Sequence, residues 1–147
     1  LMETEDILLG GEEAGGMGFK DYIPERDGSL AGLLLLEMMV YRKSNILKIL
    51  AQMEKEFGRY YYLRLDLGMR NLGVDIRAFK EIKSLLGKEV VEVKDYDGVK
   101  LICQDSSWLM FRGSGTEPIM RIYAESKSLN TSKRLIELGK SMVLGLE

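Results

Sequence analysis

The sequence predicts an α+β protein, with an antiparallel sheet and flanking helices preceded by a shorter, incomplete α/β region. Three observations support this fold class. Apolar residues recur at helical spacing in two consecutive stretches, residues 30–41 and 46–57. Short apolar runs separated by turn residues then follow one another between residues 90 and 125, as in strands linked by hairpins. A last helical stretch over residues 130–143 ends the pattern.

The chain opens with a strand candidate at residues 7–9 that ends in Gly10-Gly11, followed by a glycine-rich stretch at 12–18. That stretch is expected to be a flexible loop, because glycine makes regular structure costly. A short edge strand is expected over residues 19–23, and Pro24 closes it. The loop carries two carboxylates, at positions 12 and 13, which can accept hydrogen bonds from a ligand, bind a metal, or face water.

Two helices are predicted next. Asp27 is a suitable N-cap for the first, which is apolar on most sides and is therefore expected to pack between a sheet and another layer. Ser44 is a suitable cap for the second, and Gly58 a suitable stop. Because strands follow this glycine, the sequence predicts a first domain over residues 1–57 and a second over residues 58–147.

The second domain mixes strands and helices. A strand is expected over residues 60–67, then a helix that Asp75 caps and Gly87 ends. Cys103 alternates with other apolar side chains and is expected in the core. The remaining predicted elements are strands over residues 90–94, 99–103, 108–111 and 119–125, and a last helix capped by Asn130, Thr131 or Ser132.

The composition excludes several classes of function. The formal net charge is −2 and no basic stripe accompanies the aromatic residues, so no attraction to nucleic acid or to a membrane surface is expected. The longest apolar run, residues 30–40, is too short to span a bilayer. The absence of histidine removes His-based metal sites and Ser-His-Asp catalysis. A single cysteine excludes an intrachain disulfide and suits a reducing, cytoplasmic location.

Residues 112–118 read Arg-Gly-Ser-Gly-Thr-Glu-Pro and connect two strand candidates. The guanidinium of Arg112 matches two oxygens of a phosphate or carboxylate. Gly113 and Gly115 allow the backbone to approach a ligand closely, and the loop's hydroxyls and amides add donors. A tight turn with a solvated arginine uses the same residue types. The residues by themselves leave both interpretations open.

Two of these stretches resemble motifs of the α-D-phosphohexomutases, the superfamily that includes phosphoglucomutase and phosphomannomutase. Residues 112–118, followed by Arg-Ile-Tyr-Ala-Glu at 121–125, are similar to the family's C-terminal phosphate-binding loop. Residues 10–16, Gly-Gly-Glu-Glu-Ala-Gly-Gly, resemble its sugar-binding loop, and Arg-Asp-Gly at 26–28 resembles the segment after it. The motifs occur in the family's order and extend the resemblance over essentially the whole chain.

The resemblance implies a four-domain enzyme, of which this chain corresponds to the end of sugar-binding domain 3 and all of phosphate-binding domain 4. In the intact enzyme, a phosphoserine moves phosphate between O1 and O6 of a hexose, which is an isomerase-class phosphotransfer. Mg²⁺ and hexose 1,6-bisphosphate are implied as cofactors. The chain has neither the phosphoserine motif nor the metal motif, so no catalytic residue and no metal ligand is expected in it. As a C-terminal fragment it is expected to be inactive alone, with a hexose phosphate and the remaining domains as partners.

The resemblance also implies the site residues. The sugar hydroxyls are expected at Glu12, with Arg26 beside it. Ala14 stands where the family usually has serine, and Arg26 where it often has lysine, which is a better proton donor than arginine. The choice between glucose, mannose and glucosamine phosphates stays open, as does a stand-alone module that binds a phosphorylated ligand or a protein. The non-reacting phosphate is expected at Arg112, Ser114, Gly115, Thr116 and, more weakly, Arg121.

Overall fold

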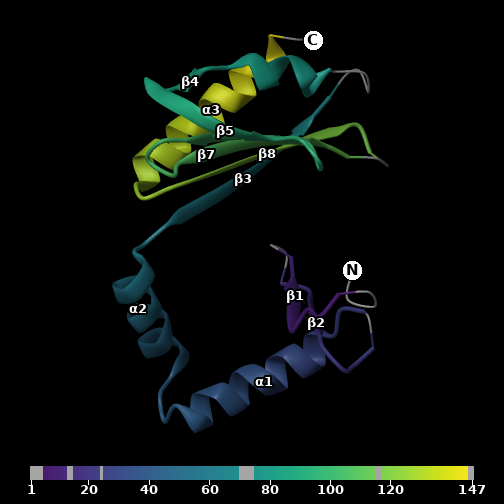
Figure 1. Cartoon of the computed structure of the whole chain (residues 1–147), viewed down its shortest axis with the longest axis vertical. Helices are drawn as coiled ribbons and strands as arrows, with labels where there is room; N and C mark the ends of the chain where they lie inside the picture. Colours follow the sequence, from purple (N-terminus) through teal and green to yellow (C-terminus); the bar gives the residue numbers. More distant parts are fainter. Residues whose placement is uncertain (1–4, 13–14, 24, 70–74, 115–116, 146–147) are drawn as a thin grey trace. The chain divides into compact units, whose positions relative to one another are not determined.

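The structure is a computed structural model that describes residues 5–12, 15–23, 25–69, 75–114 and 117–145 (Figure 1). The chain divides into two compact units, Leu1–Phe57 and Gly58–Glu147. The predicted α+β fold class, with an antiparallel sheet and flanking helices, is confirmed.

The first unit begins with a hairpin. Strands β1 (Leu9–Gly11) and β2 (Met17–Phe19) are antiparallel, and Gly10 pairs with Gly18. The predicted flexible loop over residues 12–18 is therefore wrong at its C-terminal end, because Met17 and Gly18 pair their backbones with β1. The predicted edge strand over residues 19–23 is also wrong, since β2 ends at its first residue.

Backbone hydrogen bonds hold the turn of this hairpin. The amide of Glu12 donates to the carbonyl of Gly16 at 3.0 Å, and the amide of Gly15 donates to the carbonyl of Glu12 at 3.0 Å. Gly15 has φ +89°, a conformation that costs glycine nothing. Ala14 and Pro24 lie outside the described residues.

Helix α1 (Gly28–Tyr41) begins where predicted. The carboxylate of Asp27 accepts a hydrogen bond from the amide of Leu30 at 2.9 Å, which satisfies one of the free donors of the first turn. Only Ala31 is buried in this helix, and the leucines at 33–36 are 37–64% exposed. The predicted packing of α1 between two layers is thus not found among the described residues.

Helix α2 (Ile46–Phe57) has the opposite character, with one apolar face and one polar face. Its cap is Asn45, whose side-chain oxygen accepts a hydrogen bond from the amide of Lys48 at 3.0 Å. The predicted cap Ser44 is therefore wrong by one residue. Ile49 is the buried residue of this helix.

The second unit is built on a six-stranded sheet whose neighbours are all antiparallel (Figure 1). Consecutive hairpins connect five of its strands, while the first strand of the unit pairs with the last. In spatial order the strands are β3 (Tyr61–Gly68), β8 (Ile119–Ser126), β7 (Trp108–Gly113), β6 (Val99–Cys103), β5 (Lys88–Lys94) and β4 (Ser84–Leu85).

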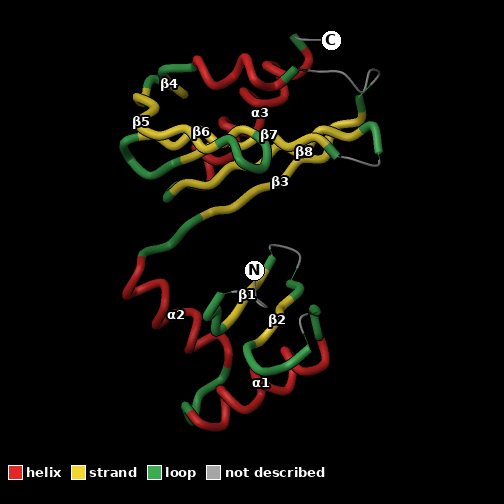
Figure 2. Tube along the Cα trace, turned by 45° about the vertical axis from the view of Figure 1, so that its right-hand side comes forward, coloured by secondary structure: helices red, strands yellow, loops and turns green. Residues whose placement is uncertain are grey.

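Helix α3 (Leu129–Leu144) covers one face of this sheet (Figure 2). Gly139 allows the close approach, because a Cβ there would lie 2.8 Å from a methyl group of Ile122. Cys103 is in the core, as predicted. The fully buried side chains under the helix alternate along the strands and include Val99, Leu101, Leu109, Phe111 and Ile122. The helix contributes Leu135 and Val143 to the same core.

Two predictions about helices in this unit are wrong. The helix expected between Asp75 and Gly87 is a 3₁₀ helix, η1 (Ile76–Glu81), followed by β4. Leu86 and Gly87 both have positive φ and form the two-residue turn from β4 to β5, so this glycine makes a hairpin rather than ending a helix. The cap of α3 is Ser128, two residues before the predicted region.

No helix among the described residues is long and apolar enough to cross a membrane.

Candidate functional site

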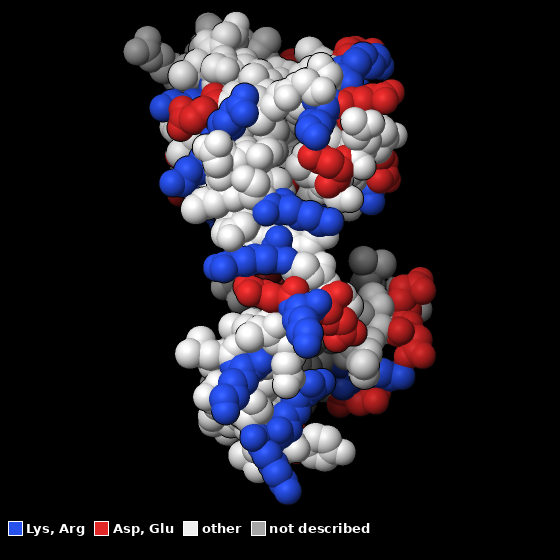
Figure 3. All heavy atoms as spheres, turned by 90° about the vertical axis from the view of Figure 1, so that its left-hand side faces the viewer, with Lys and Arg blue, Asp and Glu red and all other residues white. Residues whose placement is uncertain are grey.

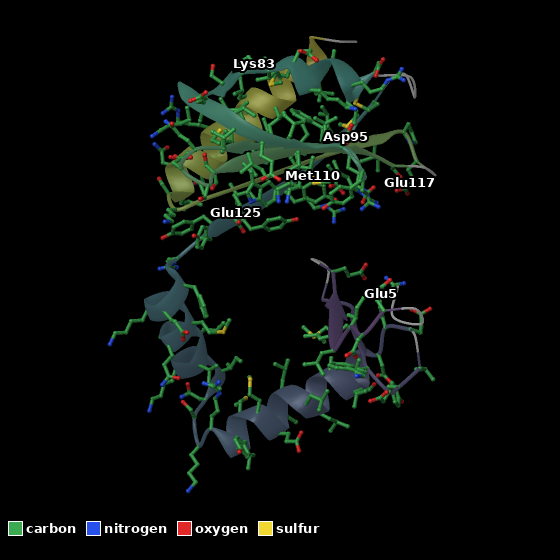
Figure 4. All side chains as sticks on the ribbon, in the orientation of Figure 1. Glu5, Lys83, Asp95, Met110, Glu117 and Glu125 are labelled. Carbon is green, nitrogen blue, oxygen red and sulfur yellow. The ribbon has the colours of Figure 1, made fainter. Side chains whose placement is uncertain are left out.

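The face of the sheet opposite α3 is polar. Alternation along β7 directs Met110 and Arg112 to this face, because Leu109 and Phe111 point into the core. Figure 4 shows Met110 and Glu125 on this side of the sheet. We call this surface the polar face; its residues include Tyr62, Arg64, Asp66, Lys100, Trp108, Met110, Arg112, Arg121, Tyr123 and Glu125.

Two arginines are direct neighbours on the polar face. Arg112 of β7 and Arg121 of β8 are opposite each other in register. Like charges directly opposite each other destabilise a sheet, so this pair needs negative charge nearby. Asp97 provides negative charge beside Arg112, because its carboxylate lies 3.0 Å from the Nε of Arg112. Arg121 has Asp66 of β3 opposite it on its other side.

The carboxylate beside Arg121, that of Asp66, already accepts hydrogen bonds from another arginine. Arg64 holds Asp66 through two hydrogen bonds of 2.7 and 2.8 Å. These bonds are the main reason that the pKa of Asp66 is lowered, and Arg121 contributes to the lowering only through its charge. Among the described residues, the buried Nε of Arg121 has no hydrogen-bond partner. A buried donor without a partner costs about 1–3 kcal/mol.

The loop that follows Arg112 is closed by two hydrogen bonds. The amide of Ser114 donates to the carbonyl of Ile119 at 2.9 Å, and the hydroxyl of Ser114 accepts from the amide of Glu117 at 3.3 Å. Ser114 therefore lies at the end of the sheet next to the arginine pair. The other two predicted ligands in the loop, Gly115 and Thr116, lie outside the described residues.

Aromatic and basic side chains also meet on the polar face. The ammonium of Lys100 lies 3.7 Å from the centre of the Trp108 ring, and burial lowers the pKa of this lysine. The Trp108 indole donates to Glu125 at 3.0 Å. The sequence predicts no basic stripe beside the aromatic residues, and Trp108 contacts one lysine and one carboxylate. The face is mixed in sign, and Figure 3 shows Lys and Arg side chains beside Asp and Glu side chains over this unit.

A second candidate site lies in the hairpin unit. A terminal nitrogen of Arg26 donates to Glu12 at 2.6 Å, and Glu25 accepts from the backbone amide of Arg26 at 2.8 Å. These three residues and the hairpin glycines line a pocket of about 190 Å³. The hydrogen bond that Arg26 donates to Glu12 is the main cause that raises the pKa of Arg26.

Gly16 makes the Glu12–Arg26 contact possible. A Cβ at this position would lie 2.5 Å from the Glu12 carboxylate and 2.6 Å from Cδ of Arg26. The space that glycine leaves is therefore filled by these two side chains. The neighbouring carboxylate, Glu13, lies outside the described residues.

Comparison with known proteins shows which family the chain resembles. Residues 1–57 match the family described as phosphoglucomutase/phosphomannomutase, alpha/beta/alpha domain III. A phosphoglucomutase/phosphomannomutase from Thermococcus kodakarensis is 33% identical over 140 residues, which is 95% of this chain and 29% of that protein. The chain belongs to the α-D-phosphohexomutase superfamily. It corresponds to the C-terminal region of these proteins.

Other members of the superfamily match over a similar share of their length. A phosphoglucosamine/phosphogalactosamine mutase from Sulfurisphaera tokodaii is 30% identical and covers 96% of this chain and 30% of that protein. The crystal structure of the Paramecium phosphoglucomutase pp63/parafusin, in its open form, is 26% identical with a TM-score of 0.66 and covers 93% of this chain and 30% of that one. The chain thus spans about 30% of the length of its phosphohexomutase relatives.

Sequence reasoning missed the carboxylates at the phosphohexomutase-like loop. Asp66 lies within the strand predicted over residues 60–67, and Asp97 lies between the strands predicted over residues 90–94 and 99–103. The contact of Asp97 with Arg112 depends on the pairing of β6 with β7. A local signal existed for one of them, because Arg64 and Asp66 are two residues apart and share a strand face.

Proposed function

We propose that the chain supplies the substrate-binding groups of a phosphohexomutase, an isomerase that moves phosphate between O1 and O6 of a hexose. Residues 58–147 form the phosphate-binding domain and hold the phosphate that does not react. Residues 1–57 form part of the sugar-binding domain and hold the hydroxyls. The phosphoserine that exchanges the phosphate comes from the enzyme's other domains, so the chain alone has no activity.

The observation that carries this proposal is the cross-strand pair of Arg112 and Arg121. It brings two guanidinium groups together on a rigid sheet, with one buried nitrogen left without a partner among the described residues. A phosphate dianion accepts hydrogen bonds from both groups and neutralises their repulsion. Ser114 lies two residues after Arg112 and supplies a hydroxyl. In this proposal Gly115 and Thr116 complete the cradle.

A binding site for a distant phosphate is useful in this chemistry. Phosphoryl transfer is catalysed mainly by positioning and by stabilisation of charge. Binding energy from the phosphate that does not react is used to orient the other end of the sugar. A pair of arginines on a sheet provides this energy without taking part in bond making or breaking.

Glu12 is the proposed acceptor for the sugar hydroxyls. Its carboxylate has capacity for about four hydrogen bonds, and the Arg26 contact uses only one oxygen. Arg26 therefore orients Glu12 and leaves lone pairs for the substrate. The names of the relatives include glucose, mannose and amino-sugar phosphates, so we propose a hexose phosphate as the substrate class.

The resemblance implies Mg²⁺ for the intact enzyme. Among the described residues no group of three His, Cys, Asp or Glu side chains could hold a metal ion. These residues do not fit a magnesium site, and we assign no step of the reaction to a metal on this chain. A cytoplasmic location is part of the same proposal, supported by a single cysteine that is buried and reduced.

A phosphate titration tests the phosphate site. Inorganic phosphate is added to the ¹⁵N-labelled chain, and the amides of residues 112–114 are followed by NMR. We expect saturable shifts with a millimolar dissociation constant. Arg112→Ala is expected to weaken binding about tenfold or more, because hydrogen bonds to charged groups are worth about 1.5–3 kcal/mol. No shift in the folded chain up to about 50 mM phosphate contradicts the proposal, since such binding is too weak to orient a substrate.

Arg77→Ala is the matched control. Arg77 is an exposed arginine of the same unit that pairs with Asp75 at 2.8 Å. Its loss removes the same charge from the molecule. If it weakens phosphate binding as much as Arg112→Ala does, the binding is a general effect of net charge and the proposed site is wrong.

A further inference from the structure

The turn between β5 and β6 lies at the same end of the sheet as the loop between β7 and β8. The antiparallel order of the strands requires this, because successive hairpins turn at alternate ends. Figure 4 shows Asp95 of the first turn and Glu117 of the second loop toward this same end. The residues of the β5–β6 turn are therefore neighbours of the candidate phosphate site.

Gly98 brings this turn into direct contact with the backbone of β7. A Cβ at Gly98 would lie 2.2 Å from the carbonyl oxygen of Phe111 and 3.2 Å from Cα of Arg112. Gly98 also has φ +91°, which a residue with a side chain adopts only with strain. Only glycine permits so close an approach, and the backbone atoms that Gly98 approaches belong to Phe111 and Arg112.

The residue before this glycine reaches the same arginine through its side chain. An oxygen of Asp97 lies 3.0 Å from Nε of Arg112. The contact involves the inner nitrogen of the guanidinium and leaves its two outer nitrogens as donors for an anion. A carboxylate on Nε therefore limits the rotation of the side chain without using the atoms that grip a phosphate.

We propose that Asp97 is a positioning residue that orients the Arg112 guanidinium for phosphate. The inference rests on the proposed function of the loop, because it assigns a role in binding. The ion pair contributes little to stability, since its side chains are 39% and 54% exposed and such pairs are worth about 0–1 kcal/mol. Its effect is instead on binding, where an arginine already held in place has less freedom to lose.

Asp97 exerts two opposite effects on a bound phosphate, and these can be separated. Its negative charge repels the anion, while its contact orders the arginine. Asp97→Asn removes the charge but keeps an oxygen near Nε. Asp97→Ala removes both. Positioning predicts the weakest binding for Asp97→Ala and near-normal binding for Asp97→Asn, whereas a purely repulsive carboxylate predicts tighter binding for both variants.

The phosphate titration is repeated with these variants of the whole chain. We expect Asp97→Ala to weaken phosphate binding about two- to tenfold, the range for one long side chain that must be ordered on binding. Asp97→Asn is expected to stay within about twofold of the unchanged chain. The heteronuclear NOE of the Arg112 Nε–Hε group reports order directly, and it should fall in Asp97→Ala.

Asp95→Ala is the control. It removes a carboxylate from the same turn, but one that pairs with Lys80 rather than with an arginine of the site. We expect unchanged phosphate binding and an unchanged Arg112 signal. The amide signals of Gly98 and Phe111 show in each variant whether the turn has kept its place on β7.

The outcomes separate the two proposals. If phosphate does not bind the unchanged chain, both the proposed function and this inference are wrong. If phosphate binds and Asp97→Ala binds it as tightly or more tightly, only the inference is wrong. Weaker binding in Asp97→Ala with a more mobile Arg112 and intact turn signals supports it.

Discussion

The two candidate sites are built on scaffolds of different strength. Arg112 lies on a strand with a partner on each side, and Leu109 and Phe111 of the same strand are fully buried. Arg26 follows a two-stranded hairpin in a unit where, among the described residues, Ala31 and Ile49 are the buried apolar side chains. In the sheet unit, packing fixes the strand that carries the arginine, whereas the hairpin unit depends on backbone hydrogen bonds and exposed ion pairs.

This difference has a consequence for binding. A site on a well-packed sheet is preorganised, so little entropy is lost when a ligand binds. A site on a small hairpin is ordered partly by its ligand or by neighbouring structure, because two strands alone are marginally stable. We therefore expect the phosphate site to work in the chain as it stands, and the sugar site to be weaker in it.

The largest effect is expected from the core of the sheet unit. Phe111→Ala removes a fully buried ring that packs 4.4 Å from the ring of Phe79, and we expect it to lower the free energy of unfolding by about 3–5 kcal/mol. Leu36→Ala in α1 changes a side chain that is 59% exposed and should cost less than about 0.5 kcal/mol. Urea unfolding followed by Trp108 fluorescence measures the first, and circular dichroism the second. Similar costs for both variants would contradict the contrast between the units.

The next largest effect is a difference in stability between alanine substitutions at two glycines with positive φ. Gly98→Ala meets the carbonyl of Phe111 at 2.2 Å, so we expect a loss above about 2 kcal/mol together with disturbed signals at Arg112. Gly87→Ala has φ +81° but nothing within 4 Å, so only backbone strain of about 1 kcal/mol is expected. Denaturant midpoints of the two variants provide the test. An equal loss of stability in the two variants would show that the backbone contact at Gly98 does not contribute to the cost of the substitution.

A smaller effect is expected in the hairpin unit. Gly16→Ala places a methyl group where Glu12 and Arg26 now meet, but both side chains can swing away at low cost. We expect loss of the Glu12–Arg26 contact, seen as shifts of the Arg26 side-chain signal, with no change in the unfolding of the sheet unit. Gly11→Ala is the control, since its nearest contact is 3.8 Å away. A shift in the stability of the sheet unit would show that the units are coupled.

The smallest effect concerns pH. The pKa of Asp75 is lowered to about 2, chiefly by hydrogen bonds from the Arg77 side chain. A depressed carboxyl pKa stabilises the fold above the ordinary value of 3.8, and this contribution is lost as the pH falls toward 2. Arg77→Ala should return the pKa toward its ordinary value, measured by carboxyl ¹³C shifts.

Glu25 of the hairpin unit provides the comparison for this titration. Its pKa is also lowered, but the largest cause is the backbone amide of Arg26 rather than the side chain. Arg26→Ala keeps that amide, so it should change the pKa of Glu25 less than Arg77→Ala changes that of Asp75. The reverse order would contradict the assignment of causes.

Much of the sheet could be predicted because its signals are local. Strand alternation and turn residues identified the four strands from β5 to β8, and Asp27 capped its helix as expected. The errors came where one residue type serves two structures. Gly87 ends helices and makes hairpin turns equally well, and Ser44 and Asn45 are both good caps.

The candidate site was predictable only in part. Arg112, Ser114 and Arg121 were identified from the loop motif, and the structure brings the two arginines opposite each other. The roles of all the site residues stay predictions. Asp97 could not be identified, because its contact with Arg112 depends on which strands pair and in which register.

The sequence by itself determined the strands from β5 to β8, the cap of α1 and the residue types that bind anions, because these follow from neighbours along the chain. Only the tertiary structure decided that two arginines of one hairpin lie beside a carboxylate from the turn between β5 and β6. The physical reason is that sheet register and side-chain burial are set by packing between segments far apart in the chain.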